Sequence, residues 1–179
     1  NDPHIYVMAM FWLPEELLER RVREDRIPYD LWKDQGYLRT CEGNKVRQKD
    51  VTDWFLEVQN DLDCYIYRGG YDAWSASYWV DEMQETFGKG VFTPVQQTMK
   101  VLSLPMKQLG ADFDSKLIVY NNNPVLKWCL ANTGIVEDKN GNIKPNKTSK
   151  ARKRIDGLAA LLDAFVVFQD CQDDYKSML

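Results

Sequence analysis

The sequence predicts an α/β fold in which helices flank a mixed central sheet, with an additional β-hairpin. Short apolar segments typical of strands alternate with amphipathic helical segments through the middle of the chain. Near the C-terminal end, Asn140-Gly141 stands between Ile135 and Ile143, and this dipeptide in that setting is a strong hairpin signal. The chain of 179 residues, 44% of them hydrophobic, is long enough for one domain with a sizeable core.

The first half of the chain is expected to open with a buried strand, because apolar residues occupy both faces of the segment 5–12. Pro14 suits the first turn of a helix, and Glu15 and Glu16 suit its positive end. A break at 27–29 should end this helix. The other elements expected here are a helical turn at 30–35, a hairpin between 37–41 and 45–46, a helix from residue 50 or 52, and a buried strand at 64–67.

The second half is expected to alternate helices with strands before a long apolar helix. The shorter elements are helices at 74–87, 103–111 and 124–132 and strands at 91–95 and 116–120. Ser103 is expected to cap the second of these helices. The last helix, at 155–169, carries apolar residues at helical spacing, is shorter than a membrane span and is interrupted by Asp163. The sequence therefore predicts no membrane-spanning segment.

The charge and the cysteine content exclude several classes of protein. With 23 Lys and Arg against 27 Asp and Glu, the net charge of −4 rules out a generally basic nucleic-acid coat but leaves room for a local basic patch. The four cysteines form no CxxC pair and there is 1 histidine, which argues against a zinc site and against Ser-His-Asp or Cys-His catalysis. We expect four reduced, buried thiols, and we expect any catalysis to depend on carboxylates.

Asp72 is the first candidate for a functional carboxylate. It follows the strand expected at 64–67 and the pair Gly69-Gly70, and ligands bind at the carboxyl ends of strands in open α/β sheets. Glycines at such a place let the backbone bend and let a phosphate or metal approach. The alternative is that Asp72 caps the helix expected from Trp74, and one residue can do both.

Asp156 and Asp163 are candidates on the last helix. Asp156 stands at its start, where a carboxylate also suits the helix dipole. Asp163 follows seven residues later on roughly the same side, either as an outer ligand or as a satisfied aspartate at the edge of the core. Six cations precede Asp156, and they suit either a solvated loop or a site where a metal and a phosphate meet. They are Lys144, Lys147, Lys150, Arg152, Lys153 and Arg154.

Carboxylate ligands select Mg²⁺ or Mn²⁺ rather than zinc. Two such ions about 4 Å apart can activate a water and stabilise the leaving oxygen in phosphodiester cleavage. This mechanism requires a few carboxylates around the ions and no histidine, which agrees with the composition of the chain.

Several short motifs follow one another in a characteristic order. They are FWLPEE at 11–16, PYDLWKDQGYL at 28–38, Thr40 with Gly43 and Val46, YDAW at 71–74, NPVLKW at 123–128 followed by Asn132, NIKPNK at 142–147 and RIDGLAA at 154–160. Each motif is weak alone, but their joint order is specific and covers nearly the whole chain. In this order they resemble the C-terminal nuclease domain of the large terminase subunit of tailed bacteriophages and prophages.

The resemblance implies an RNase H-like fold and metal-dependent cleavage of concatemeric double-stranded viral DNA during packaging. Asp72 and Asp156 match two of the family's metal-binding acids, and Lys147 and Lys150 then become phosphate contacts. The resemblance further implies the terminase small subunit and the portal as partners, the cytoplasm of the bacterial host as location, and a monomer for the isolated domain.

Two features depart from the family's pattern. The family's first catalytic aspartate lies on the opening strand of the fold, and here that strand is expected upstream of Asn1. No G-x-x-x-x-G-K-[ST] loop of a packaging ATPase occurs. We therefore expect a single nuclease domain over 1–179, without the first strand and the ATPase domain, and with weak or no cleavage by itself.

Two other functions stay open. A non-catalytic DNA- or portal-binding module would use exposed tryptophans, although core packing is the ordinary role of that residue. The candidates are Trp32, Trp74, Trp79 and Trp128. The other alternative is a different RNase H-like enzyme, a resolvase or transposase, which a preference for branched or end-specific DNA would favour.

Overall fold

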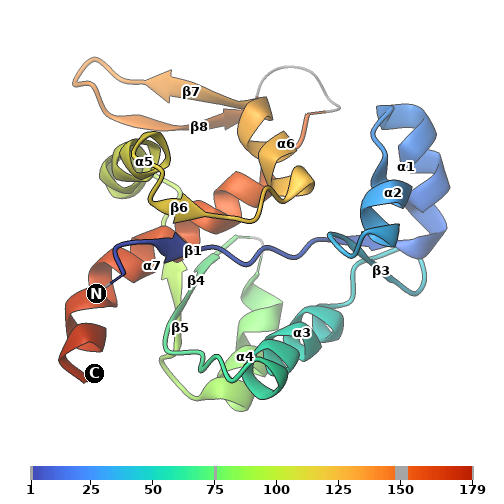
Figure 1. Cartoon of the computed structure of the whole chain (residues 1–179), viewed down its shortest axis with the longest axis horizontal. Coiled ribbons are helices and arrows are strands. Elements are labelled where there is room, and N and C mark those ends of the chain that lie inside the picture. The colour runs from blue at the N-terminus through green and yellow to red at the C-terminus, as the bar shows by residue number, and fades with distance from the viewer. Residues whose placement is uncertain (1, 75, 148–152, 179) are drawn as a thin grey trace.

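The computed structural model describes residues 2–74, 76–147 and 153–178, and it has a mixed α/β fold (Figure 1). The described strands form four two-stranded sheets rather than one continuous sheet. Three pairs are parallel: β1 (Ile5–Tyr6) with β6 (Ile118–Val119), β2 (Trp12–Pro14) with β3 (Arg39–Cys41), and β4 (Gly69–Asp72) with β5 (Phe92–Val95). The fourth, β7 (Thr133–Glu137) with β8 (Ile143–Lys147), is antiparallel.

Helices of very different length surround these strand pairs. They are the 3₁₀ turn η1 (Glu15–Leu17) and the helices α1 (Leu18–Asp25), α2 (Tyr29–Asp34), α3 (Gln48–Asp61), α4 (Ser77–Phe87), α5 (Met99–Asp114), α6 (Pro124–Asn132) and α7 (Asp156–Met178). Within the described ranges, none of them is long and apolar enough to cross a membrane.

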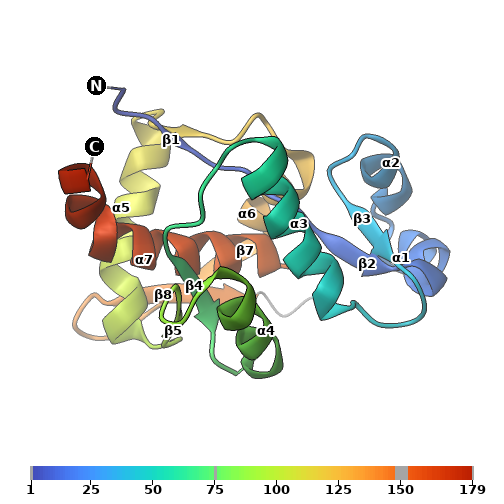
Figure 2. The same ribbon diagram turned by 90° about the horizontal axis from the view of Figure 1, so that it is seen from below.

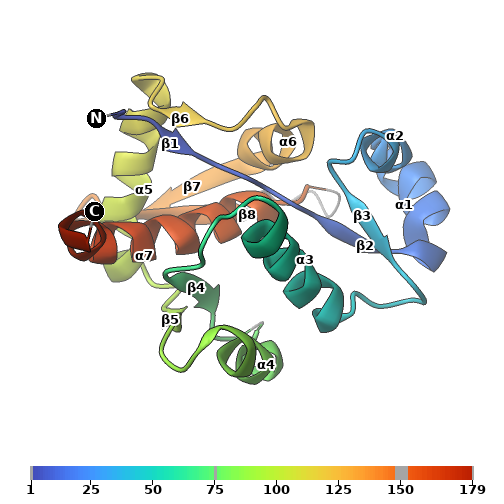
Figure 3. The ribbon, with the colours of Figure 1, turned by 60° about the horizontal axis from the view of Figure 1, so that its bottom comes forward.

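The long helix α7 is the centre of the molecule. It lies beside α5, α6 and the β4–β5 pair (Figures 1 and 3). Its buried side chains Leu158, Leu162 and Phe165 join Leu102 of α5 and Ile118 of β6 in the main core. Because each such side chain contributes about 1.5–3 kcal/mol when fully buried, α7 holds the fold together.

Two smaller cores lie on either side of the main one. The first packs Tyr29 and Trp32 of α2 against Trp128 of α6. The second packs Phe55, Trp79 and Phe92 around a fully buried Met83. Three of the four tryptophans considered as surface candidates thus pack in cores, whereas Trp74 is 93% exposed.

The opening segment differs from the expected single buried strand. It divides into β1 and β2, joined by an extended segment that crosses the molecule towards α1 (Figure 3). The hairpin expected over 37–46 is also wrong, because β3 pairs in parallel with β2 and the Arg39 amide donates to the Phe11 carbonyl at 2.8 Å. The charged residues Glu42 and Lys45 lie exposed in the following turn, so they offer no apolar face for a return strand.

The strand expected at 64–67 forms at Gly69–Asp72 instead. Cys64 and Tyr65 are exposed, while the two glycines permit a close approach to neighbouring elements. A Cβ atom added at Gly70 would lie 2.5 Å from the backbone oxygen of Asp163 on α7. Only a glycine lets β4 reach α7 this closely, so the pair Gly69-Gly70 serves packing as well as bending.

The hairpin expected around Asn140-Gly141 is confirmed as β7–β8. The Asp138 carboxylate accepts hydrogen bonds from the backbone amides of Asn140 and Asn142, which closes the turn. Ser103, expected as a helix cap, instead accepts from the Ile143 amide at 3.0 Å and anchors the hairpin to α5. Thr98 caps α5 by accepting from the Val101 amide.

The cysteines are all free thiols. Cys41 and Cys129 are buried, as expected, but Cys64 is exposed and Cys171 is partly exposed. The expectation of four buried thiols is therefore wrong for the last two, because Cys64 lies in the loop before β4 and Cys171 near the exposed end of α7.

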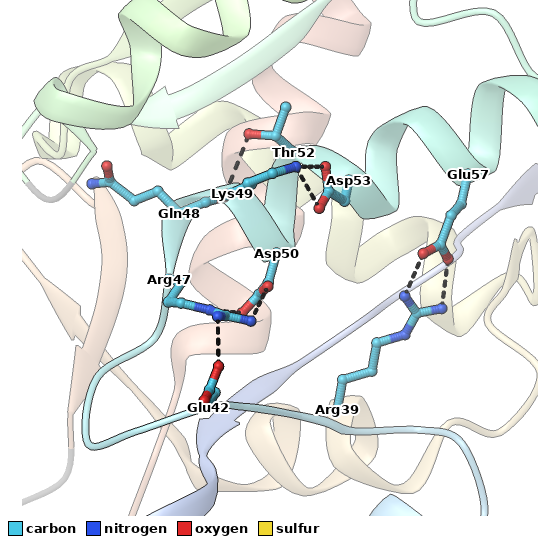
Figure 4. A network of polar contacts seen from close by, with 9 residues as sticks. All are labelled: Arg39, Glu42, Arg47, Gln48, Lys49, Asp50, Thr52, Asp53 and Glu57. Carbon is cyan, nitrogen blue, oxygen red and sulfur yellow. Dashed lines mark hydrogen bonds and ion pairs between the residues drawn. The ribbon is translucent and has the colours of Figure 1, made fainter.

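A surface ion-pair network joins β3 and the turn after it to α3 (Figure 4). Its members are Arg39, Glu42, Arg47, Lys49, Asp50, Asp53 and Glu57. Arg39 donates to both carboxylate oxygens of Glu57, at 3.0 and 2.7 Å, and so connects β3 to the middle of α3. Exposed pairs of this kind contribute about 0–1 kcal/mol each.

Candidate active site

Asp72 lies at the carboxyl end of β4. Because β4 and β5 are parallel and Asp72 pairs with Val95, the carboxyl ends of both strands meet at one edge. Its Oδ1 atom accepts a hydrogen bond from the Trp74 amide at 3.0 Å, which forms a tight turn after the strand. The helix α4 begins later, with Ala76 as its N-cap and no side-chain cap, so the alternative role of Asp72 as a helix cap is wrong.

Asp163 faces this edge from α7 and is only 5% exposed. Its Oδ1 atom accepts a hydrogen bond of 2.8 Å from the side-chain amide of Gln97, which also donates to the Val95 carbonyl at 3.2 Å. Gln97 follows β5, so residues from both strand ends and from α7 converge here.

Burial raises the pKa of Asp163 to about 6, the Gln97 hydrogen bond opposes this rise, and the charge of Asp72 adds to it. The two carboxylates, which we call the carboxylate pair, therefore act on each other across the contact between β4 and α7. Within the described ranges, no Lys or Arg forms an ion pair with Asp163. Two like charges at the edge of a core are a favourable place for a cation.

Asp156 is the first residue of α7 and is exposed. It lies two helical turns, or about 10 Å, before Asp163 along the axis. The following Gly157 holds the start of α7 against α6, since a Cβ atom there would lie 3.1 Å from the Cys129 sulfur. Burial raises the pKa of that thiol to about 11, and the charge of Asp156 adds to the rise.

The structure thus brings together two of the three predicted carboxylates, Asp72 and Asp163. Across residues 2–74, 76–147 and 153–178, no three His, Cys, Asp or Glu side chains gather closely enough to hold a metal ion by themselves. Mg²⁺, however, is usually held by one or two carboxylates together with waters and substrate phosphate. The oxygen donors of the carboxylate pair fit Mg²⁺ or Mn²⁺ in this mode.

The predicted cations are spread over two elements. Lys144 and Lys147 lie on β8, and because they are three residues apart their side chains leave opposite faces of the hairpin. Lys153 and Arg154 precede α7, and Lys150 and Arg152 lie outside the described residues. The Arg154 carbonyl accepts from the Asn132 side chain at 3.2 Å, which ties this segment to the end of α6.

A pocket of about 350 Å³ opens beside Asp72. Its lining comes from the turn after β4, the end of β5 and the cap of α5: Ala73, Trp74, Val95, Gln96, Gln97 and Thr98. The sequence reasoning missed Gln97, whose only signal is its place two residues after Val95, at the end of a strand. Carboxylates, amides and an exposed indole therefore share one edge of the β4–β5 sheet.

The structure is a mixed α/β domain with a buried acid facing a strand edge and a basic segment before its last helix. Residues 1–171 match the terminase large subunit endonuclease domain family, and the chain belongs to that family. The resemblance seen in the sequence motifs is thereby confirmed.

The chain is also similar to two further proteins and to one solved structure. The terminase large subunit of Enterobacteria phage HK97 is 31% identical over 159 residues, which cover 87% of this chain and 30% of the relative. The protein YmfN of Escherichia coli K12 is 24% identical over 171 residues, covering 90% of this chain and 36% of YmfN. The crystal structure of the HK97 large terminase superposes with a TM-score of 0.75 at 28% identity, covering 87% of this chain and 32% of that one. The chain spans about a third of the length of these proteins.

Proposed function

We propose that this domain cuts double-stranded DNA concatemers during phage packaging, by metal-dependent hydrolysis of a phosphodiester bond. The carboxylate pair supports this proposal most directly, because it lies in a domain of this family at the strand edge where α/β proteins bind ligands. We further propose an RNase H-like arrangement, with the terminase small subunit and the portal as partners in the cytoplasm of the bacterial host. Family membership favours this function over a resolvase or a transposase.

In this proposal, Asp72 and Asp163 would hold Mg²⁺ or Mn²⁺, and Asp156, earlier on the same helix as Asp163, would be a further ligand of the reacting centre. Bound divalent ions lower the pKa of water and stabilise charge on the phosphate, in the two-metal manner. Gln97 holds Asp163 through its 2.8 Å hydrogen bond to Oδ1, and the other carboxylate oxygen would then be the one to bind an ion. Gly70 permits the approach of β4 to α7 that forms the pair.

The basic segment would hold the DNA backbone. Lys144, Lys147, Lys153 and Arg154, with Lys150 and Arg152 between them, supply positive charge on a chain of net charge −4. Phosphate contacts of this kind position DNA without reading its sequence. This agrees with cleavage of long concatemers with little sequence preference.

Cleavage of supercoiled plasmid in Mn²⁺ tests the proposal. We expect Asp72→Ala and Asp156→Ala to lower the rate at least about 100-fold, because each removes a ligand of the reacting centre. Asp170→Ala is the matched control, since Asp170 is an exposed carboxylate on the same helix. Equal cleavage by all four proteins, or cleavage by none of them with the wild type also failing to bind DNA, would refute the proposed function.

A further inference from the structure

Trp74 differs from every other tryptophan of the chain. Its side chain is 93% exposed. The other five pack against aromatic neighbours: Trp12 against Trp54 at 5.8 Å, Trp32 against Trp128 at 5.7 Å, and Trp79 against Phe55 at 6.0 Å between ring centroids. An exposed large apolar side chain next to a candidate active site indicates a binding role, because the fold gains nothing from leaving it in water.

The backbone of Trp74 is fixed relative to Asp72. The Trp74 amide donates to the Asp72 carboxylate at 3.0 Å, and the Ala76 amide donates to the Asp72 carbonyl at 3.1 Å. The indole therefore starts two residues from a proposed metal ligand, from a backbone amide that is hydrogen-bonded to the carboxylate of that ligand. A group that contacts the indole would therefore lie close to the phosphate at the proposed metal site of Asp72.

The pocket beside Trp74 has the chemistry of a nucleobase site. None of the six lining residues that the structure describes is charged, so this lining does not suit a phosphate. The side-chain amide of Gln96 and the hydroxyl of Thr98 offer donors and acceptors, as the edge of a base requires. Gln97 adds an acceptor, its carbonyl oxygen, because its NH₂ group already donates to Asp163 and to the Val95 carbonyl. The indole supplies a flat apolar face, on which any base can stack.

We propose that Trp74 stacks on an unpaired nucleobase that flanks the phosphate being cut, with the edge of the base in this pocket. This inference rests on the proposed nuclease function and names a contact that determines where the substrate lies. Stacking of one base on an aromatic side chain predicts that Trp74→Ala weakens DNA binding about 5- to 150-fold. The salt dependence of binding should stay unchanged, because the indole neutralises no phosphate.

The test is a double-mutant cycle between Trp74 and the bases. The affinity for a short fluorescent single-stranded oligonucleotide is measured in Ca²⁺. It is compared with the affinity for an oligonucleotide that has the same backbone but abasic sites throughout. We expect Trp74→Ala to lose affinity for the normal strand only, and Trp74→Phe to recover part of the loss. Tyr65→Ala is the control, since Tyr65 is also exposed, at 76%, but lies before β4 rather than after it.

The outcomes separate the two proposals. Equal affinities of wild type and Trp74→Ala, or an equal loss on the abasic strand, would overturn the stacking while plasmid cleavage still reports on the nuclease. The first of these results is also what a Trp74 that packs against a protein partner would give. A wild-type chain that binds neither this strand nor plasmid DNA would overturn both proposals together, and loss of single-strand binding alone would overturn only the stacking.

Discussion

The surface ion-pair network around α3 and the carboxylate pair between β4 and α7 are two opposite uses of charge. In the network, cations and carboxylates alternate in water, and the hydrogen bonds from Arg47 and Arg39 hold the pKa values of Asp50 and Glu57 below their usual range (Figure 4). In the pair, two carboxylates lie at the edge of a core, and burial raises the pKa of Asp163 to about 6.

The two regions differ in how their charges affect the stability of the fold. Opposite charges in water satisfy one another and contribute little to folding. Like charges at a buried edge cost folding free energy, which a divalent cation would return on binding. The strands that bring them together, β4 and β5, lie against α7 (Figure 2).

The largest effect should come from neutralising Asp163. We expect Asp163→Asn to reduce Mn²⁺-dependent plasmid cleavage about 100-fold, because the amide still accepts the Gln97 hydrogen bond but cannot neutralise a cation. The matched variant Asp53→Asn changes a carboxylate of the network and should leave cleavage unchanged. A wild-type rate for Asp163→Asn would remove Asp163 from the metal site.

The pH dependence of the free energy of unfolding should distinguish Asp163→Asn from the wild type. The folded pKa of Asp163 is raised from 3.8 to about 6, so its penalty is absent below pH 4, grows as the pH rises and is complete above pH 6. At pH 7.5 without metal, Asp163→Asn should therefore be more stable than the wild type, by up to about 3 kcal/mol. Urea denaturation at pH 4 and 7.5 measures this difference, and an equal offset at both values would contradict it.

The contact between β4 and α7 should be sensitive to a single methyl group. Gly70→Ala places a Cβ atom against the Asp163 backbone and against Val167, and should cost about 1–3 kcal/mol. Gly110→Ala is the control, because nothing lies within 4 Å of its added Cβ atom and alanine favours the helix α5. Thermal unfolding of both variants checks this, and similar midpoints would show that β4 is less closely packed than described.

The smallest effect should come from the network itself. Arg39→Ala removes two hydrogen bonds to Glu57, yet we expect a loss of about 0–1 kcal/mol that shrinks further at high salt. Denaturation at low and high ionic strength measures it. A loss of several kcal/mol, independent of salt, would mean that the network is not merely a set of exposed pairs.

The sequence predicted what depends on local signals. The β7–β8 hairpin follows from Asn140-Gly141, and the start of α6 follows from Asn123 and Pro124. It did not predict which strands pair, since β2 and β3 are parallel and distant in sequence. It also did not place β4 correctly. The pair Gly69-Gly70 indicates a bend in the sequence, but in the structure Gly70 permits close packing against α7.

The candidate site was predicted in its parts more than in its assembly. Asp72 was expected at a strand end, and that is where it lies. The closeness of Asp72 to Asp163 and the support from Gln97 depend on contacts between residues 66 or more positions apart. The exposure of Trp74 depends on which surface the rest of the fold leaves uncovered. No periodicity or motif within a single element carries that information.

The measurement that tests the central claim most directly is calorimetric titration of the chain with Mn²⁺ at pH 7.5, beside the Asp72→Ala/Asp163→Asn double variant. We expect saturable binding to the wild type, a rise in its unfolding midpoint with metal, and neither effect in the double variant. Equal binding and equal stabilisation of both proteins would contradict a cation site at the carboxylate pair.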